Sequence, residues 1–191
     1  MRLVLIAALS ISFSATPASA GEAQQVRETK KYSVGIGYAG STIDVDAARD
    51  GDDLVTLNGW GVRGRMQLKE LWALQFRYLE DEQDFSSGGK LSLDQLDVQA
   101  NFKLHESNRK YFHVYATLGM SRLDFEERIP LIGVFSDRAF GAAVGVGLEY
   151  GPQCCAFFVD LSATFVDLRL NPGDSETWTV GNTITGFTYR F

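Results

Sequence analysis

The chain has 191 residues, with 24 acidic and 18 basic side chains and a formal net charge of −6. A chain of this length suits one domain. The acidic balance argues against a nucleic-acid-binding protein, which would present a basic surface.

The first 20 residues are typical of a secretory signal peptide. Arg2 precedes an apolar run at residues 3–9, and the small side chains of residues 18–20 form an A-x-A cleavage site. A membrane-anchoring helix would need about 20 apolar residues, and serines interrupt this run after residue 9. We therefore expect the mature chain to begin at Gly21 and residues 21–30 to form a short periplasmic tail.

Alternation of apolar with polar or small side chains runs through residues 31–191. A period of two is the pattern of β-strands, because successive side chains of a strand point to opposite faces. Each segment can supply the roughly 9–11 residues of a tilted membrane-spanning strand. The sequence therefore predicts an all-β fold, an eight-stranded antiparallel up-and-down transmembrane barrel, with strands near residues 32–38, 59–68, 72–79, 96–103, 112–121, 140–150, 157–165 and 178–191.

The connections between these segments alternate in length. Short ones are expected at residues 69–70, 105–110 and 151–155, and longer ones at residues 41–53, 81–90, 123–137 and 169–176. An even number of strands puts both ends of the barrel domain on the short-turn side. Short periplasmic turns and longer extracellular loops are typical of outer-membrane barrels.

A secreted soluble barrel of the lipocalin type would show the same alternation, with its apolar stripe facing inward. Three features favour the membrane barrel. The second stripe of residues 139–147 consists of Ala and Gly, which suit the inside of a narrow barrel. Tyr32 with Tyr38, and Trp72 with Tyr78, place rings about 20 Å apart, as two interfacial girdles require. The third feature is that the apolar stripe continues to the last residue.

The last six residues, GFTYRF, put Phe187, Tyr189 and Phe191 on one face of a strand. They resemble the C-terminal strand of bacterial outer-membrane proteins, in which a terminal Phe and alternate aromatic residues form the assembly signal. The resemblance implies that the barrel-assembly machinery reads these three residues.

The chain resembles the small outer-membrane barrels of the OmpA and OmpX type over residues 31–191. The features that carry this resemblance are the signal peptide, the eight amphipathic strands, the unequal connections and the terminal Phe. The resemblance implies an integral protein of the Gram-negative outer membrane, surrounded by lipid and lipopolysaccharide and working as a monomer. It says little about activity.

Charged side chains fall on the stripe predicted to face the lumen. An eight-stranded barrel is only just wide enough to be filled by side chains, so buried charges must be paired. Arg77 and Asp97, on adjacent strands at similar heights, are the pair we expect. A gated ion path and a polar core that fixes strand register are both compatible with these charges, and we favour the second. The lumen set is Arg63, Arg65, Arg77, Asp97, Lys103, Glu149, Asp160 and Arg190.

One short motif resembles an enzyme site, because some small barrels deacylate lipid A with a His-x-Ser-Asn stretch and a distant Glu. This chain has His105-Glu106-Ser107-Asn108. His105 opens a predicted periplasmic turn, away from the outer leaflet, and no acidic partner follows at the expected spacing. Ten-stranded protease barrels are excluded by the strand count. We expect no enzymatic activity, no cofactor and no metal.

Two connections raise questions that the sequence leaves open. Cys154 and Cys155 are adjacent in a periplasmic turn, where a strained disulfide, an intermolecular bridge or two plain thiols are all compatible with an oxidising compartment. The first long loop carries five aspartates, and a solvated acidic loop is favoured over weak binding of divalent cations. These aspartates are Asp44, Asp46, Asp50, Asp52 and Asp53.

The third long connection contains an apolar stretch between charged flanks, and exposed apolar patches often mark contacts. It is either a partner site or a hairpin that continues the barrel wall. Its candidate contact residues are Ile129, Leu131, Ile132, Val134 and Phe135. The expected function is a structural or interaction role through the extracellular loops, in adhesion to a ligand or host surface or in envelope integrity. A small-solute pore is the second hypothesis, and a lipid A-modifying enzyme is the least favoured.

Overall fold

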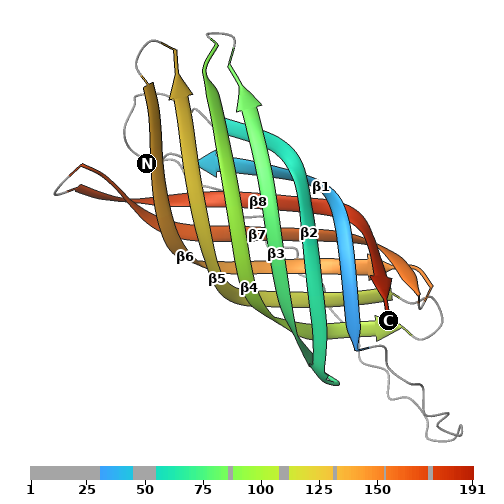
Figure 1. Cartoon of the computed structure of the whole chain (residues 1–191). Helices are drawn as coiled ribbons and strands as arrows, with labels where there is room; N and C mark the ends of the chain where they lie inside the picture. Colours follow the sequence, from blue (N-terminus) through green and yellow to red (C-terminus); the bar gives the residue numbers. More distant parts are fainter. Residues whose placement is uncertain are drawn as a thin grey trace, which may run out of the picture.

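The protein forms one closed ring of eight antiparallel strands in the computed structural model (Figure 1). The structure describes residues 31–44, 55–85, 88–107, 112–130, 133–152, 154–171 and 174–191. Each strand pairs with its neighbours in sequence, and β1 closes the ring on β8. The strands are β1 (Tyr32–Asp44), β2 (Val55–Lys69), β3 (Trp72–Asp84), β4 (Lys90–Ser107), β5 (Phe112–Ile129), β6 (Gly133–Tyr150), β7 (Cys155–Asn171) and β8 (Asp174–Arg190). The predicted up-and-down barrel is confirmed.

Alternating exposure along the strands shows which stripe faces outward. On β1, Val34 and Ile36 are exposed, whereas Ser33 and Ala39 are buried. The other strands show the same alternation of exposed and buried side chains. The apolar stripe is therefore on the outside of the barrel, and the polar stripe lines the lumen. Among the described residues, no helix is long and apolar enough to cross a membrane.

An apolar belt surrounds the outside of the barrel, and aromatic rings mark its two edges. At one edge Trp60 and Tyr78 pack edge to face with ring centroids 5.9 Å apart. At the other edge the rings of Tyr32 and Phe191 are stacked 6.0 Å apart. We define this apolar belt by residues 32–38 on β1, 60–68 on β2, 72–78 on β3, 96–104 on β4, 112–120 on β5, 140–150 on β6, 157–165 on β7 and 187–191 at the end of β8.

The seam between β1 and β8 closes the barrel as far as the last residue. The Tyr32 N–H donates to the Phe191 carbonyl at 3.1 Å, and the Phe191 N–H donates to the Tyr32 carbonyl at 2.9 Å. Residue 191 therefore lies at the same rim as the β2–β3 and β6–β7 turns (Figure 1). We call this end the short-turn rim and the opposite end the far rim.

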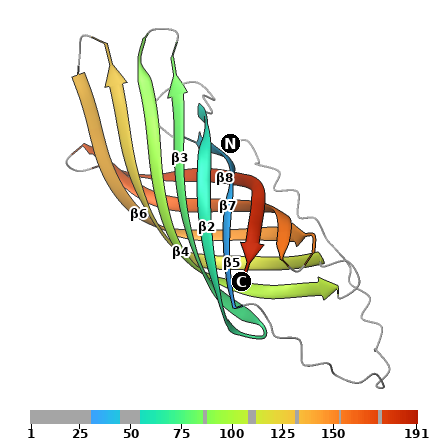
Figure 2. The same ribbon diagram turned by 45° about the vertical axis from the view of Figure 1, so that its right-hand side comes forward.

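At the far rim the strands run further than the sequence predicted. The segment predicted as a loop at residues 169–176 lies mostly in the ends of β7 and β8. Two further segments predicted as loops, residues 81–90 and 123–137, are mostly the outer ends of the hairpins β3–β4 and β5–β6. Pairing continues out to Asp84↔Lys90 in the first hairpin and Ile129↔Gly133 in the second. These outer ends form a four-stranded sheet that rises beyond the apolar belt (Figure 2), and we call it the outer sheet.

Candidate functional site

The best-defined contact in the lumen is the predicted pair of Arg77 and Asp97. These residues lie directly opposite each other on β3 and β4. Arg77 Nε donates to Asp97 Oδ2 at 2.8 Å, and Arg77 Nη2 donates to Ser162 Oγ at 2.8 Å. Gln95 Nε2 donates to the other oxygen of Asp97 at 2.8 Å. Both charged side chains are almost completely buried, so pairing must offset their desolvation.

A second network gathers around Glu149 nearer the short-turn rim. Arg63 and Arg190 each form an ion pair with Glu149, and Arg65 Nη1 lies 3.7 Å from the same carboxylate. Arg63 also lies 3.3 Å from Asp160. Arg65, Arg63 and Glu149 are buried, whereas Arg190 is partly exposed at the rim. The structure thus brings five of the eight predicted lumen charges into one network.

Lys103 lies apart from both networks. Its Nζ is 2.8 Å from Glu106 Oε2 at the short-turn rim, in an ion pair that is half exposed on the Glu106 side. Lys103 lies at this rim because it is close to the end of β4, where inward-facing side chains are no longer enclosed by the barrel.

Tyr115 was not singled out from the sequence, yet it connects the second network. Arg63 Nη1 donates to Tyr115 Oη at 2.6 Å, and the Tyr115 hydroxyl donates to Asp160. Gly147 makes this possible, because a Cβ there would lie 2.5 Å from the Tyr115 ring. The sequence predicts that the Ala-Gly stripe of β6 faces the inside of a narrow barrel, and at Gly147 the space left by the missing side chain is filled by Tyr115 and Asp160.

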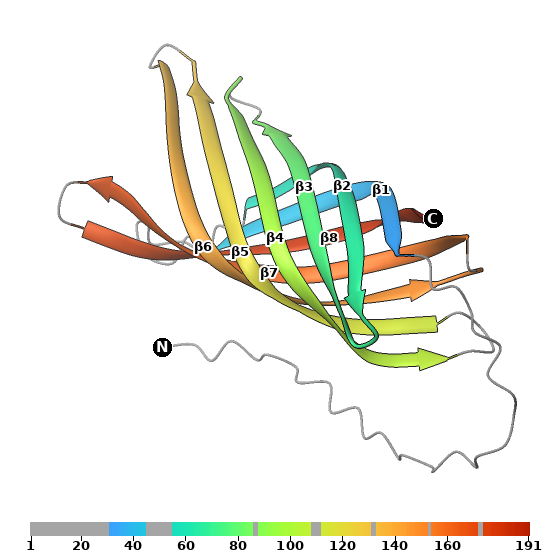
Figure 3. The same ribbon diagram turned by 60° about the horizontal axis from the view of Figure 1, so that its bottom comes forward.

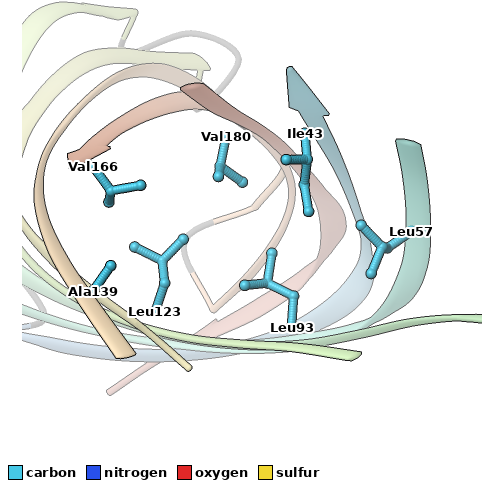
Figure 4. Packing of buried hydrophobic residues seen from close by; sticks show 7 residues of the cluster. All are labelled: Ile43, Leu57, Leu93, Leu123, Ala139, Val166 and Val180. Atoms are coloured by element: carbon cyan, nitrogen blue, oxygen red, sulfur yellow. The ribbon is translucent and has the colours of Figure 1, made fainter. Parts of the chain in front are cut away.

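Towards the far rim the inside of the barrel becomes apolar. Seven buried side chains from seven strands converge there (Figure 4). Phe125 and Trp178 pack against these side chains, and their two rings meet each other edge to face with centroids 6.0 Å apart. We call this group the apolar plug; its buried members are Ile43, Leu57, Leu93, Leu123, Ala139, Val166 and Val180.

The outer face of the outer sheet carries rows of charge above the apolar belt. Four side chains lie side by side across β3 to β6 in the register Glu80↔Asp94↔Asp124↔Arg138. Arg138 Nε is 2.5 Å from Asp124. The other basic side chains of this face are also paired: Arg122 with Asp124 at 2.6 Å, Lys90 with Glu82 at 2.7 Å and Arg128 with Glu126 at 2.7 Å.

One edge of the outer sheet is open. The ladder between β6 and β7 ends at Gly141↔Val166, whereas β6 stays paired to β5 as far as Gly133. Within the described part of the chain, residues 133–140 of β6 therefore have a strand partner on one side only, and Figure 3 shows β6 turning away from the β7–β8 hairpin. Val134 and Phe135 on this edge are 60% and 54% exposed.

The predicted contact stretch thus belongs to a hairpin rather than to a long loop. Ile129 ends β5, and Val134 and Phe135 begin β6. Leu131 and Ile132 lie outside the described residues, as does most of the acidic segment, from residue 45 to residue 54.

Comparison with known proteins assigns the family. Residues 5–191 match the family model described as outer membrane protein beta-barrel domain. The chain belongs to this family. Its apolar belt therefore lies in the outer membrane, the short-turn rim is periplasmic and the outer sheet is extracellular.

Solved structures show the same fold at low sequence identity. Ail, the attachment invasion locus protein of Yersinia pestis, is 20% identical, with 85% of this chain and 99% of Ail covered and a TM-score of 0.57. Neisserial surface protein A is 10% identical, with 84% and 97% covered and a TM-score of 0.66. OprG from Pseudomonas aeruginosa is 14% identical, with 85% and 96% covered and a TM-score of 0.58. No curated protein sequence matches the chain.

The C-terminal aromatic residues of this outer-membrane barrel face outward. Phe187, Tyr189 and Phe191 are all exposed on the outside of β8, and the rings of Tyr189 and Phe191 stack 6.2 Å apart. The stripe thus lies in the periplasmic half of the apolar belt, beside the seam.

Two remaining motifs also lie at the periplasmic rim. His105 is at the end of β4, with its ring 6.3 Å from that of Phe112, and Asn108 lies outside the described residues. Cys154 and Cys155 are exposed, with their sulfurs 3.4 Å apart. That separation is well beyond a disulfide bond of about 2.05 Å, so no such bond joins these two sulfurs.

Proposed function

We propose that this outer-membrane barrel is a cell-surface interaction protein that uses its extracellular sheet, in adhesion or in contacts within the envelope. The observation that carries the proposal is the open edge of β6. A strand with unpaired N–H and C=O groups is a template for an added strand, and natural proteins normally cover or blunt such edges. Here the edge carries exposed Val134 and Phe135.

The chemistry of the outer sheet favours a polypeptide partner. Ail has been solved in complex with the heparin analogue sucrose octasulfate. A sulfated ligand needs available cations, but Lys90, Arg122, Arg128 and Arg138 are each engaged with a carboxylate. An extended segment that pairs with the β6 backbone makes no such demand, because main-chain hydrogen bonds supply the affinity.

The lumen supports a scaffold role in the same proposal. Paired charges fill its periplasmic part, and the apolar plug fills its extracellular part. Ions would have to cross both layers, so we place function on the outer sheet and treat the lumen as the core that holds it.

The route to the membrane is also part of the proposal. Residues 1–20 would be removed as a signal peptide, and the barrel-assembly machinery would read Phe187, Tyr189 and Phe191. The mature protein would then work as a monomer among lipid and lipopolysaccharide.

The test is to shorten the β5–β6 hairpin by replacing residues 127–135 with a two-residue turn. Cells producing this variant should lose binding to cultured epithelial cells and to one another. The matched control shortens the β3–β4 hairpin over residues 83–91 and leaves the β6 edge intact, so binding should persist. Equal binding by both variants would contradict the proposal, and a steady single-channel conductance of the purified protein would support the pore instead.

A further inference from the structure

A buried polar group lies directly beneath the apolar plug. Asp81 on β3 and Ser41 on β1 have no exposed surface, and Asn182 on β8 is 3% exposed. Ser41 Oγ is hydrogen-bonded to Asp81 Oδ2 and lies 2.8 Å from Asn182 Oδ1. Ser41 and Asn182 are register partners across the seam, whereas Asp81 reaches them past β2. It can do so because its partner on β2 is Gly59, which has no side chain.

The hydrogen-bond count of this group is one proton short. Asn182 Nδ2 donates to the Val180 carbonyl at 3.4 Å, so Asn182 turns its oxygen towards Ser41. Asp81 and Asn182 thus both offer acceptor oxygens, and the Ser41 hydroxyl has a single hydrogen to donate. Asp81 Oδ1 has no hydrogen-bond partner among the described residues. With a proton on Asp81 the chain is complete, because the carboxyl donates to Ser41 Oγ and Ser41 donates to Asn182 Oδ1.

The surroundings of Asp81 offer no countercharge within the described part of the chain. Its partner on β4 is Leu93, a member of the apolar plug. The inward-facing positions around it are Ala39 and Ile43 on β1, Leu57 and Gly59 on β2, Leu79 on β3, Gln95 on β4, and Val180 and Ile184 on β8. The nearest inward-facing charges on β2, β3 and β4 are Arg63, Arg77 and Asp97, and these are engaged in the ion pairs described above.

Asp81 lies outside the lipid-spanning part of β3. Tyr78 is the last residue of the apolar belt on this strand, and Glu80 and Glu82, on either side of Asp81, carry charge on the outer face. Burial raises the pKa of the Asp81 carboxyl to about 6, although the hydrogen bond from Ser41 acts in the opposite direction. An ionised carboxylate there would be a buried charge against apolar side chains, which is costly.

We propose that Asp81, Ser41 and Asn182 form a proton-binding site that makes the extracellular closure of the lumen sensitive to pH. When protonated, the site ties β3, β1 and β8 together beneath the apolar plug. When ionised, it places an uncompensated charge beside Leu93 and Leu57 and weakens the plug. The sign follows from the raised pKa: stability is highest below the ordinary pKa of an aspartate, about 3.9, and declines as the pH rises through the folded value.

The first test is the urea midpoint of unfolding of the full mature protein in detergent micelles, measured from pH about 4 to about 8. The wild-type midpoint should fall steadily between the unfolded pKa of about 3.9 and the folded pKa of about 6, and it should level off at higher pH. Asp81→Asn should remove most of the fall, because the amide keeps a donor for Ser41 and cannot ionise. Asp84→Asn, an exposed position on the same strand, should leave the wild-type profile unchanged.

A second measurement keeps the proposal testable if Asp81→Asn fails to fold. Infrared difference spectra of the wild-type protein should show a protonated-carboxyl band that persists above pH about 5, where carboxyls of ordinary pKa are mostly ionised, and that is lost by pH about 7. Absence of a protonated-carboxyl band above pH about 5 would overturn the proposal, as would an unchanged pH profile in Asp81→Asn. A midpoint that responds to sodium but not to choline at equal ionic strength would identify a sodium site instead and would also overturn it.

Discussion

Two Arg–Asp pairs of the same cross-strand type lie in opposite surroundings in this barrel. Arg77 and Asp97 are register partners on β3 and β4 and are buried in the lumen. Arg138 and Asp124 are register partners on β6 and β5, and both are substantially exposed on the extracellular sheet. In the lumen the protein must replace the water around each charge, whereas on the sheet the water remains. The same side-chain pair therefore acts as an obligatory core contact in one region and a minor surface contact in the other.

The buried pair should give the largest effect. Asp97→Ala leaves the Arg77 guanidinium without its partner and removes the acceptor of Gln95, so we expect a loss of about 3–5 kcal/mol in the free energy of unfolding. Urea unfolding in detergent micelles measures it. The control is the double variant Arg77→Met with Asp97→Leu, which removes both charges and should cost far less. Wild-type stability in Asp97→Ala would mean that water surrounds the pair, and a pore would then become the better hypothesis.

Packing around the second network should give an intermediate effect. In Gly147→Ala the added Cβ meets the Tyr115 ring at 2.5 Å, so the ring must shift from its contacts with Arg63 and Asp160. We expect a loss of about 1–3 kcal/mol by the same unfolding measurement. Gly64→Ala is the matched control, because a Cβ there has nothing within 4 Å. If both variants lose equal stability, the loss comes from replacing glycine in a strand backbone and not from crowding of the lumen.

The exposed pair should give the smallest effect. Arg138→Ala removes an ion pair that stays in contact with water, and Asp124 keeps Arg122 as a partner. The expected loss is about 0.2–1 kcal/mol, and it should shrink further at high salt. A loss as large as that of Asp97→Ala would show that burial is not what separates the two regions.

The period of two was enough to predict the barrel and the lumen charges. Parity alone assigns Arg63, Arg65, Arg77, Asp97, Glu149 and Asp160 to the inside, where the structure has them. Parity does not give height along the barrel axis, because neighbouring strands are staggered. Arg77 and Asp97 lie on adjacent strands, so their pairing could be predicted from the sequence. The three arginines around Glu149 come from strands whose relative heights are known only from the strand register in the structure.

Alternation of polarity does not predict the extracellular sheet, and the reason is physical. Within the membrane an outward side chain must be apolar, so polarity alternates strongly. Above the membrane the outward side chains of β3, such as Glu80 and Glu82, are charged, and the alternation disappears just where the strand continues. Asp81 was therefore assigned to a loop although it lies inside the barrel. The apolar plug was missed because its members are scattered over seven strands, one or two on each segment, and only closure brings them together.

The seam between β1 and β8 has a consequence for the order of folding. Every other ladder joins strands that are consecutive in sequence, so each can form as a local hairpin. Across the seam, by contrast, Thr188 donates to the Val34 carbonyl at a sequence separation of 154 residues. The loop-closure entropy of such a contact grows only logarithmically, by about 0.6 kcal/mol per doubling of the intervening chain. Closing the seam thus costs little free energy at equilibrium. It is nevertheless expected to form after the hairpins, because non-local strands pair only once local contacts have brought them close together.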